Sequence, residues 1–279
     1  MSLVNSGYLS TIGYVQETTY GVAPSSASFS VLAIATAEPN LNGNYIPIYA
    51  LGQRAAYFVL RGRREVEVRQ EFYPQDKTAI SIPISSYTNS YTLWCQYINI
   101  NANLTLVGAK AEEITLVGRV GEPLRATVSW YCKDVTSSAP TGGTMGTVST
   151  KTPYHFDRQS ITYSGSALTA ATDFECRIRN NLERIWQFND VSIRAAPEKN
   201  VEITGTVRVT LGSTGQITDF LSDTYFDMDI TLGVDSVTTS PTVLKLYRCK
   251  WERVPIPQSP TDIIALALPY RASSVSIIG

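Results

Sequence analysis

The chain contains few residues whose types and spacing could support catalysis. Its single histidine, His155, would have to be the base of any Ser/His or Cys/His arrangement. Asp227 and Asp229 alternate along a predicted strand, where two carboxylates could act as acid and base, as they do in a glycoside hydrolase. A surface histidine and a solvated strand face account for these residues more simply. We therefore predict that the chain is not an enzyme and has no catalytic residues.

Cofactor and metal motifs are equally scarce. The segment Gly142–Gly146 is glycine-rich, but it does not lie between a predicted strand and a predicted helix, as phosphate-binding loops do. The four cysteines, Cys95, Cys132, Cys176 and Cys249, are widely separated and form no CxxC pair. We predict no cofactor and no metal site. We expect Cys95, Cys132 and Cys249 to be buried free thiols, because each lies beside apolar or aromatic residues, and disulfides stay open.

A strict alternation of polar and apolar residues occurs twice. Residues 65–72 read Glu-Val-Glu-Val-Arg-Gln-Glu-Phe, and residues 201–211 read Val-Glu-Ile-Thr-Gly-Thr-Val-Arg-Val-Thr-Leu. A period of two predicts strands with one buried face and one wet face. At an offset of 135 residues Val66 falls on Val201 and Phe72 on Val207, which indicates a duplicated β unit.

Both copies keep the wet face polar, which is more easily explained if that face lines something than if it meets bulk water. The residues predicted to share this face are Glu65, Glu67, Arg69 and Glu71 in the first copy and Glu202, Thr204, Thr206 and Arg208 in the second. Acidic residues are in excess over these two segments.

The composition restricts the possible partners. Charged residues make up 17% of the chain, below the usual ~25%, which is typical either of proteins packed against copies of themselves or of ordinary Ser/Thr-rich β proteins. The net charge of −1 and the lack of a basic run disfavour tight binding to nucleic acid, but not contact with DNA that slides past. No signal peptide and no apolar run of ~18 residues is seen, so we expect a soluble cytoplasmic product with no membrane span.

The pattern along the chain predicts an all-β fold with one or two short helices, in two tandem related β units. The expected boundaries are 1–135 for the first unit, 136–152 for a Ser/Thr/Gly linker and 153–279 for the second unit. Short helices are expected at 90–98 and 212–221, and strands at 29–35, 113–118, 123–132, 225–232, 243–251 and 262–270.

Residues 39–64 form a long, irregular, Tyr- and Arg-rich stretch, read as an extended loop or long hairpin. Loops of this length are usually functional or ordered by a partner. Tyrosine is enriched at protein interfaces, and sugar-binding sites use it as well, so both interpretations stay open. The candidates for contact with another subunit are Tyr45, Tyr49, Arg54, Tyr57, Arg61, Arg63 and Arg64.

Several short segments resemble the tail tube proteins (major tail proteins) of tailed phages and related archaeal viruses. The opening Gly13-Tyr-Val-Gln-Glu-Thr-Thr-Tyr-Gly-Val-Ala-Pro is similar to their E-x-x-Y-G-T segment, with Val22 in place of Thr. Gly121-Glu-Pro-Leu before a strand and Phe174-Glu-Cys-Arg-Ile-Arg-Asn-Asn-Leu-Glu resemble two further elements.

The resemblance implies a β sandwich or barrel whose protomers form rings, and rings that stack into a tube carrying DNA. The partners would then be other copies of the chain and other tail proteins, with DNA only in transit through the lumen. The expected location is the virion tail, after assembly in the host cytoplasm. The polar strand faces would line the lumen. Another tail ring protein, such as a terminator or baseplate component, and a carbohydrate-binding β module are the alternatives.

Overall fold

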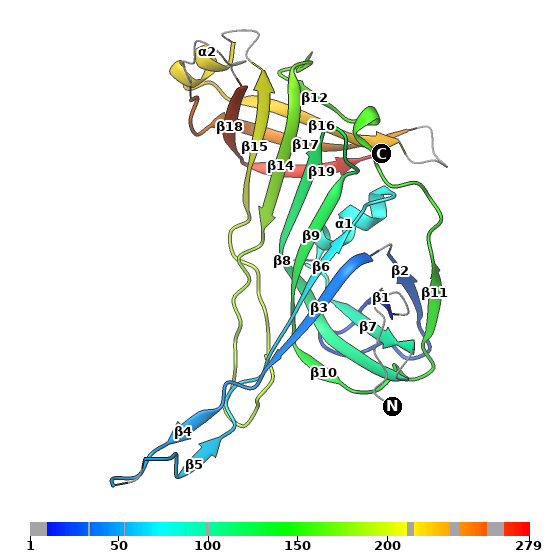
Figure 1. The fold of residues 1–279 in the computed structure, drawn as a ribbon, viewed down its shortest axis with the longest axis vertical. Helices are drawn as coiled ribbons and strands as arrows, with labels where there is room; N and C mark the ends of the chain where they lie inside the picture. Colours follow the sequence, from blue (N-terminus) through cyan, green and yellow to red (C-terminus); the bar gives the residue numbers. More distant parts are fainter. Residues whose placement is uncertain are drawn as a thin grey trace.

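The computed structural model describes residues 10–32, 34–52, 54–86, 88–98, 101–210, 215–234, 240–255 and 265–279. The fold is all-β with two short α-helices, as predicted (Figure 1). Its strands fall into two sets that follow one another along the chain. The first set is β1 (Ser10–Gln16), β2 (Ser28–Val31), β3 (Ile34–Asn42), β6 (Glu65–Phe72), α1 (Lys77–Ser85), β7 (Tyr91–Tyr97), β8 (Ala102–Arg119), β9 (Arg125–Cys132) and β10 (Asp134–Thr136).

The second set contains the same number of elements in the same order. It is made of β12 (Ser160–Tyr163), β13 (Ser166–Ala167), β14 (Ala171–Arg179), β15 (Glu202–Thr210), α2 (Gly215–Leu221), β16 (Phe226–Val234), β17 (Pro241–Trp251), β18 (Ala265–Ala272) and β19 (Ser274–Ile278). Every antiparallel pairing in the first set has a counterpart in the second. The strand order is therefore the same in the two halves.

Three details fix which residues correspond. A residue with positive φ follows Val107 in β8 and Tyr247 in β17, namely Gly108 and Arg248. β3 and β14 each have a bulge one residue after their first residue. Glu65 pairs with Asn42 at the end of β3, as Glu202 pairs with Arg179 at the end of β14.

Equivalent residues of the two halves are therefore 137 positions apart for β3 and β6, and 140 positions apart for β8 to β10. The sequence comparison used an offset of 135. Glu65 thus matches Glu202. A shift of two residues keeps each side chain on the same face of its strand, so the predicted faces are unaffected.

One sheet runs through both halves of the chain. Its strand order is β3-β6-β9-β8-β14-β15-β18, and the last residues of β17 pair onto β18. We call this sheet the wall. The ladder between β8 and β14 joins the two halves, and both sets of wall strands stand side by side in Figure 1.

Each half adds a smaller sheet over one face of the wall. The first consists of β2, β1, β7, β10 and the start of β8, and the second of β13, β12, β16, β19 and the start of β17. β8 and β17 belong to both layers and change sheet near Gly108 and Arg248. Buried side chains from both halves pack as one core cluster between the layers.

Two sequence predictions differ from the structure in this region. Residues 90–98, predicted as a helix, contain strand β7, which lies between β1 and β8 and is buried along most of its length. The helix of the first half is α1 instead, with Asp76 Oδ1 accepting from the backbone N–H of Ala79 at 3.0 Å as its N-cap. α2 lies within the predicted 212–221, of which residues 215–221 are described.

The Ser/Thr/Gly segment 136–152 also contains structure. β11 (Thr144–Val148) lies parallel to β2 and connects the two halves along the first small sheet. The division into units 1–135 and 153–279 stays a prediction.

Strands predicted at 29–35, 113–118, 123–132, 225–232, 243–251 and 262–270 correspond to β2 with β3, β8, β9, β16, β17 and β18. Residues 33 and 262–264 of these ranges lie outside the described residues. Of the predicted loop 39–64, residues 39–42 belong to β3, and the described part of 43–64 forms a long projecting hairpin, in which β4 (Ile46–Ile48) pairs with β5 (Phe58–Leu60) beyond the end of β3 and β6 (Figure 1).

Candidate functional site

The eight residues predicted to share a polar face lie on one face of the wall. Residues paired across an antiparallel ladder point to the same side of a sheet. Arg69 pairs with Ser129, and Ser129 also pairs with Glu113 on β8. Glu113 in turn pairs with Arg179 on β14, which pairs with Glu202. Polar side chains of β6 and β15 therefore belong to one continuous surface, which we call the polar face.

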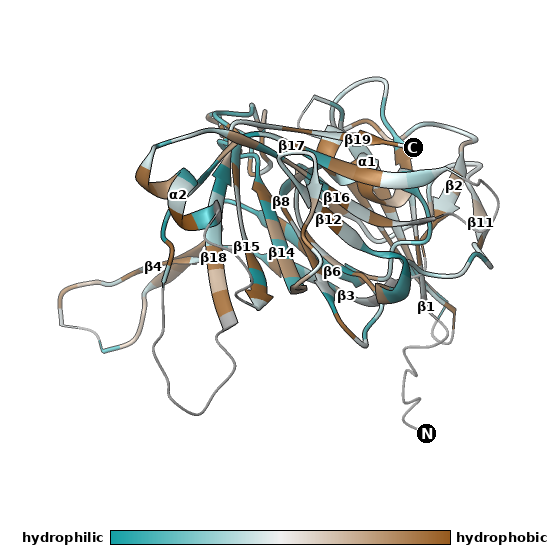
Figure 2. Ribbon diagram, turned by 90° about the horizontal axis from the view of Figure 1, so that it is seen from above, coloured by the Kyte–Doolittle hydropathy of each residue, from teal (hydrophilic) through white to brown (hydrophobic). Residues whose placement is uncertain are grey.

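The opposite face of the same strands is apolar and covered. Val66, Val68, Ile203 and Val207 are between 0% and 2% exposed. The alternation that predicted these strands thus separates a packed side from an open side. In the view from above, the wall and the small sheets stack as layers (Figure 2).

The polar face carries nearly equal numbers of acidic and basic side chains. The excess of glutamate on β6 and β15 is offset by arginines on the neighbouring strands. The acidic residues are Glu38, Glu65, Glu67, Glu71, Glu113, Asp173, Glu175, Glu202 and Glu252, and the basic ones are Arg69, Lys110, Arg119, Arg125, Arg177, Arg179, Arg208, Lys250 and Arg271.

Many of these charges are paired with one another. Arg271 Nη1 lies 2.8 Å from Glu202 Oε1, and its Nε lies 2.9 Å from Glu252 Oε1. Arg208 Nη1 lies 3.6 Å from Asp173 Oδ2. These neighbours raise the pKa of the Arg271 guanidinium, mainly through its hydrogen bonds to Glu252 and Glu202. Arg125, Arg177, Arg208 and Arg271 are thus engaged by carboxylates of the same face.

A second long connection, residues 180–201, was not predicted as part of the site. It joins β14 to β15 and lies along the first half of the same chain. Arg184 Nη1 lies 3.1 Å from Glu67 and 3.7 Å from Glu65, and its guanidinium stacks 4.0 Å from the ring centre of Tyr131. The connection has the same length as residues 43–64, and no property of its sequence revealed this contact.

The candidates for contact with another subunit divide into two groups. Tyr45, Tyr49, Arg54, Tyr57 and Arg61 are exposed on the projecting hairpin or at its base. Arg63 and Arg64 contact their own chain in this structure, and their contact with another subunit stays a prediction. Arg63 lies over the ring of Trp186 at 4.8 Å, and Arg64 forms an ion pair with Asp134.

The hairpin is apolar on both of its faces. Its exposed apolar side chains are Tyr45, Ile46, Ile48, Tyr49, Leu51, Tyr57, Phe58, Val59 and Leu60, each at least 41% exposed. An isolated two-stranded hairpin is marginally stable in water, and a large exposed apolar patch usually marks an interaction site.

The residues considered for acid–base chemistry are occupied with local contacts. His155 Nδ1 lies 2.9 Å from Asp157 Oδ1 on the surface. Asp227 Oδ1 accepts from the backbone N–H of Arg248 at 2.8 Å, and Asp229 pairs with Lys245 at 3.2 Å. Asp227 therefore supports the bend of β17, and Asp229 belongs to a cross-strand ion pair.

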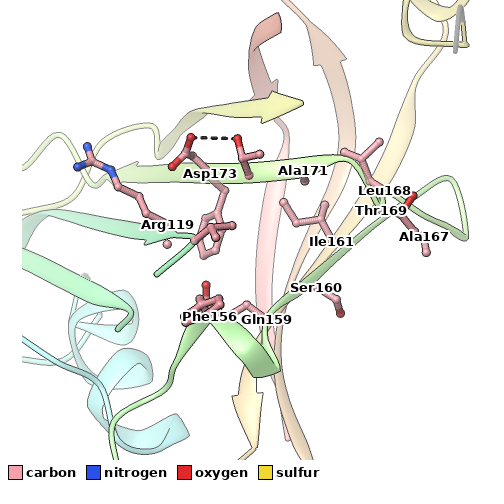
Figure 3. Close-up of a pocket in the computed structure, with 14 residues that line it drawn as sticks. Arg119, Phe156, Gln159, Ser160, Ile161, Ala167, Leu168, Thr169, Ala171 and Asp173 are labelled. Carbon is pink, nitrogen blue, oxygen red and sulfur yellow. Dashed lines mark hydrogen bonds between the residues drawn. The ribbon is translucent and has the colours of Figure 1, made fainter. Parts of the chain in front are cut away.

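A pocket opens where the end of β8 meets the second half (Figure 3). Ile161, Leu168 and Phe174 supply apolar surface, and the charged lining residues are Arg119 and Asp173. The Asp173 carboxylate accepts from the Thr172 hydroxyl at 3.1 Å, which the dashed line marks. The lining contains no pair of carboxylates and no nucleophile–base pair.

The segment Glu17-Thr-Thr-Tyr-Gly has a structural role. The Glu17 carboxylate is buried and accepts four hydrogen bonds, from Gly21 N at 2.8 Å, Gly108 N at 2.7 Å, Ser90 Oγ at 2.6 Å and Thr92 Oγ1 at 2.8 Å. Both glycines have positive φ, and a Cβ on Gly21 or Gly108 would collide with the side chain of Lys133. The carboxylate therefore ties the turn after β1 to β7 and to the bend of β8.

Comparison with known proteins decides the family. A family model described as "Phage tail tube protein" matches residues 7–272. The chain belongs to the phage tail tube protein family. Its all-β fold and the resemblance seen in the sequence agree with this membership.

Two solved structures are similar to this tail tube family member only in part. Hcp1 from Flavobacterium johnsoniae aligns over 43% of this chain and 94% of its own, with 9% identity and a TM-score of 0.26. A chain of the anti-feeding prophage (AFP) baseplate, determined by cryo-EM with 6-fold symmetry, aligns over 60% and 93% respectively, with 9% identity and a TM-score of 0.30. No curated protein matches the chain.

The described residues also bear on membranes and metals. Among them, no helix has both the length and the apolar character that crossing a membrane requires. The same part of the chain holds no group of three His, Cys, Asp or Glu side chains placed to bind a metal ion. All four cysteines are free and buried, which confirms the prediction for Cys95, Cys132 and Cys249.

Proposed function

We propose that the chain assembles with copies of itself into rings, and that the rings stack into the tube of a viral tail through which DNA passes. The observation that carries the proposal is the wall, a single sheet shared by both halves with one packed face and one open polar face. Closing such sheets into a ring places one face inside and removes free sheet edges, which otherwise promote aggregation.

The polar face lines the lumen in this proposal. Lys and Arg bind DNA by neutralising phosphates, and each such contact holds the DNA in place. Here Arg271, Arg208 and Arg177 already pair with carboxylates of the same face. Phosphates therefore meet a wall with balanced charge and few unengaged cations, along which DNA can slide.

The projecting hairpin contacts another subunit, in the adjacent ring. Its exposed apolar side chains lie on both faces of two short strands, so burial requires a partner that surrounds it. Its position beyond the end of the wall carries it away from its own protomer (Figure 1). A second copy of the chain, stacked along the strand direction, satisfies both conditions.

The two sets of strands correspond to two tube-like β units, residues 1–135 and 153–279, joined by 136–152. One chain then supplies two neighbouring segments of a ring. The role is structural, the location is the tail of a virion, and assembly takes place in the host cytoplasm with other tail proteins. DNA is a partner only in transit.

Electron microscopy of the purified protein in negative stain tests this function. Tubes of stacked rings are the expected result. Single rings that never stack would assign the chain to a terminator or baseplate position in the tail. Monomers at all concentrations would overturn self-assembly. A variant lacking residues 46–60 tests the stacking step separately. Because the wall is intact, it should form rings that do not stack.

A further inference from the structure

The outermost strands at the two ends of the wall are β3 and the end of β17. They correspond to β14 and β8, the two strands that pair in the middle of the wall. β14 pairs with β15 on one side and with β8 on the other, whereas its counterpart β3 pairs with β6 alone among the described residues. The second half of β8 lies between β9 and β14. Its counterpart, the end of β17, pairs with β18 and with no further wall strand in the described part of the chain.

We infer that β3 of one copy pairs with residues 252–255 of another copy, in the register that β14 uses on β8. This inference rests on the proposed self-assembly and names the edges that carry it. Each chain would then repeat, with the next chain, the junction that already joins its own two halves. Such a head-to-tail contact uses two different surfaces and generates rings if the rotation closes.

The register follows from the correspondences fixed by the bends and bulges. In the internal ladder Glu113 pairs with Arg179 and Ile114 with Ile178. A step of 140 residues carries Glu113 and Ile114 to Arg253 and Val254, and a step of 137 carries Asn42 and Leu41 to Arg179 and Ile178. The expected pairs between copies are therefore Arg253 with Asn42 and Val254 with Leu41.

The chemistry of the two edges fits this register. Ile114 and Ile178 are each 1% exposed where the internal ladder buries them. Leu41 is 50% exposed on the free edge, although it occupies the position of Ile178. Pairing with Val254 would bury it against another apolar side chain, as in the internal junction.

The polar end of the internal ladder is reproduced as well. The Glu112 carboxylate accepts hydrogen bonds from Arg179 Nε at 3.1 Å and from the backbone N–H of Leu182 at 2.7 Å, and so holds the end of β14 against β8. The equivalent residue of the second half is Glu252, which is exposed in the single chain where Glu112 is buried, and which accepts from Arg271 Nε at 2.9 Å. Asn42 replaces Arg179 and offers an amide N–H to that carboxylate, while Arg253 can donate to the Asn42 amide oxygen.

Pro39 restricts how the β3 edge can be used. The backbone N–H of Asn180, which continues β14, donates to Glu112 O at 2.8 Å, so alternate residues of β14 donate toward β8. Under the same alternation the backbone N–H of Leu41 points toward the neighbouring copy. Pro39 occupies the next such position and has no N–H. Proline is tolerated on edge strands because it has no N–H to donate, and Pro39 ends the row of donors on this edge just beyond the residues expected to face 252–255.

Disulfide trapping tests the register directly. Facing residues that are not hydrogen-bonded have Cα atoms about 4.5 Å apart, which suits a disulfide. Chains carrying N42C or R253C, with different tags, would be mixed under mild oxidation. A covalent mixed dimer that neither chain forms alone is the expected result. The native thiols are buried, and burial raises the pKa of Cys95, Cys176 and Cys249 to about 12, which keeps them out of the exchange.

The control mixes L41C with R253C. A shift of one residue places the two thiols on opposite faces of the sheet, so no mixed dimer is expected. Cross-linking of N42C with itself would show β3 pairing with β3 and would overturn the inference. Rings seen by microscopy without the N42C–R253C product would also overturn it while leaving the proposed function intact. Monomers without any product would refute both.

A second variant separates assembly from folding. Leu41→Asp places a charge on an edge that is half exposed in the single chain, so the unfolding temperature should change little while rings are lost. Val22→Asp, at a position that is 56% exposed and away from both edges, should leave rings unchanged. Rings of normal yield from Leu41→Asp would contradict the inference.

Discussion

Glu17 provides the sharpest test of how the sequence holds this fold. Replacing it with Ala removes the acceptor of four hydrogen bonds, from two backbone N–H groups and two hydroxyls. Ser90 and Thr92 can turn their hydroxyls toward other acceptors. The N–H groups of Gly21 and Gly108 are held by backbone with φ of 72° and 65° and cannot turn away.

The expected loss follows from the cost of leaving buried donors without an acceptor, about 1–3 kcal/mol for each group. Two fixed donors, together with the cavity left by the side chain, give about 3–5 kcal/mol. At about 2–4 °C per kcal/mol, the Tm of Glu17→Ala should fall by roughly 6–20 °C. Calorimetry and urea unfolding followed by tryptophan fluorescence measure both quantities.

Two variants bracket this value. Glu17→Gln keeps one acceptor oxygen and turns an amide toward a donor, so its loss should be smaller than that of Glu17→Ala but measurable. Glu122→Ala removes an exposed glutamate from the turn after β8 and should change the free energy of unfolding by less than about 0.5 kcal/mol. A Glu17→Ala protein within about 1 kcal/mol of the original would refute the view that this carboxylate holds β1, β7 and β8 together.

The other predictions concern assembly, DNA and the thiols. Replacing Glu65, Glu67, Glu71 and Glu202 with Lys should leave tubes intact, because each exposed ion pair contributes no more than about 1 kcal/mol, but should slow DNA passage. Normal DNA delivery by such particles would contradict a lumenal polar face. Replacing residues 46–60 with a short Gly/Ser turn should give folded protomers that do not elongate in sedimentation velocity, and tubes of normal length would show that the hairpin is dispensable. The four thiols should not react with Ellman's reagent at pH 8 until the chain is unfolded, because burial raises the pKa of Cys132 well above its ordinary value and that of the other three to about 12. Since the unfolded thiols lose protons first, stability should be unaffected below about pH 8 and should fall between about pH 9 and pH 12, and a flat profile there would contradict the burial.

Local periodicity determined the strands and the direction in which each side chain points. Glu65 to Phe72 alternates without interruption, so the polar face of β6 could be predicted from composition and spacing alone. The same holds for β15. The sequence alignment of these two segments is offset by two residues from the alignment in the structure. A shift by an even number of residues leaves each side chain on the same face of its strand.

Periodicity failed where both faces of an element are buried. Tyr91–Tyr97 packs between β1 and β8, so its apolar residues follow no alternation, and its i, i+4 spacings imitated a helix. α1 was missed although Asp76 gives a helix start signal, because Pro74 and Pro83 frame a short apolar run that reads as irregular.

The sequence by itself thus determined an all-β chain, a repeated unit and a polar strand face, because these depend on local alternation. Only the tertiary structure decided that β8 pairs with β14, that residues 180–201 lie along the first half, and that β3 and the end of β17 have no second wall neighbour among the described residues. Strands pair through backbone hydrogen bonds, which are nearly the same for every residue. The side-chain pattern therefore fixes which way a strand faces and leaves its neighbour to be chosen by the packing of the whole chain.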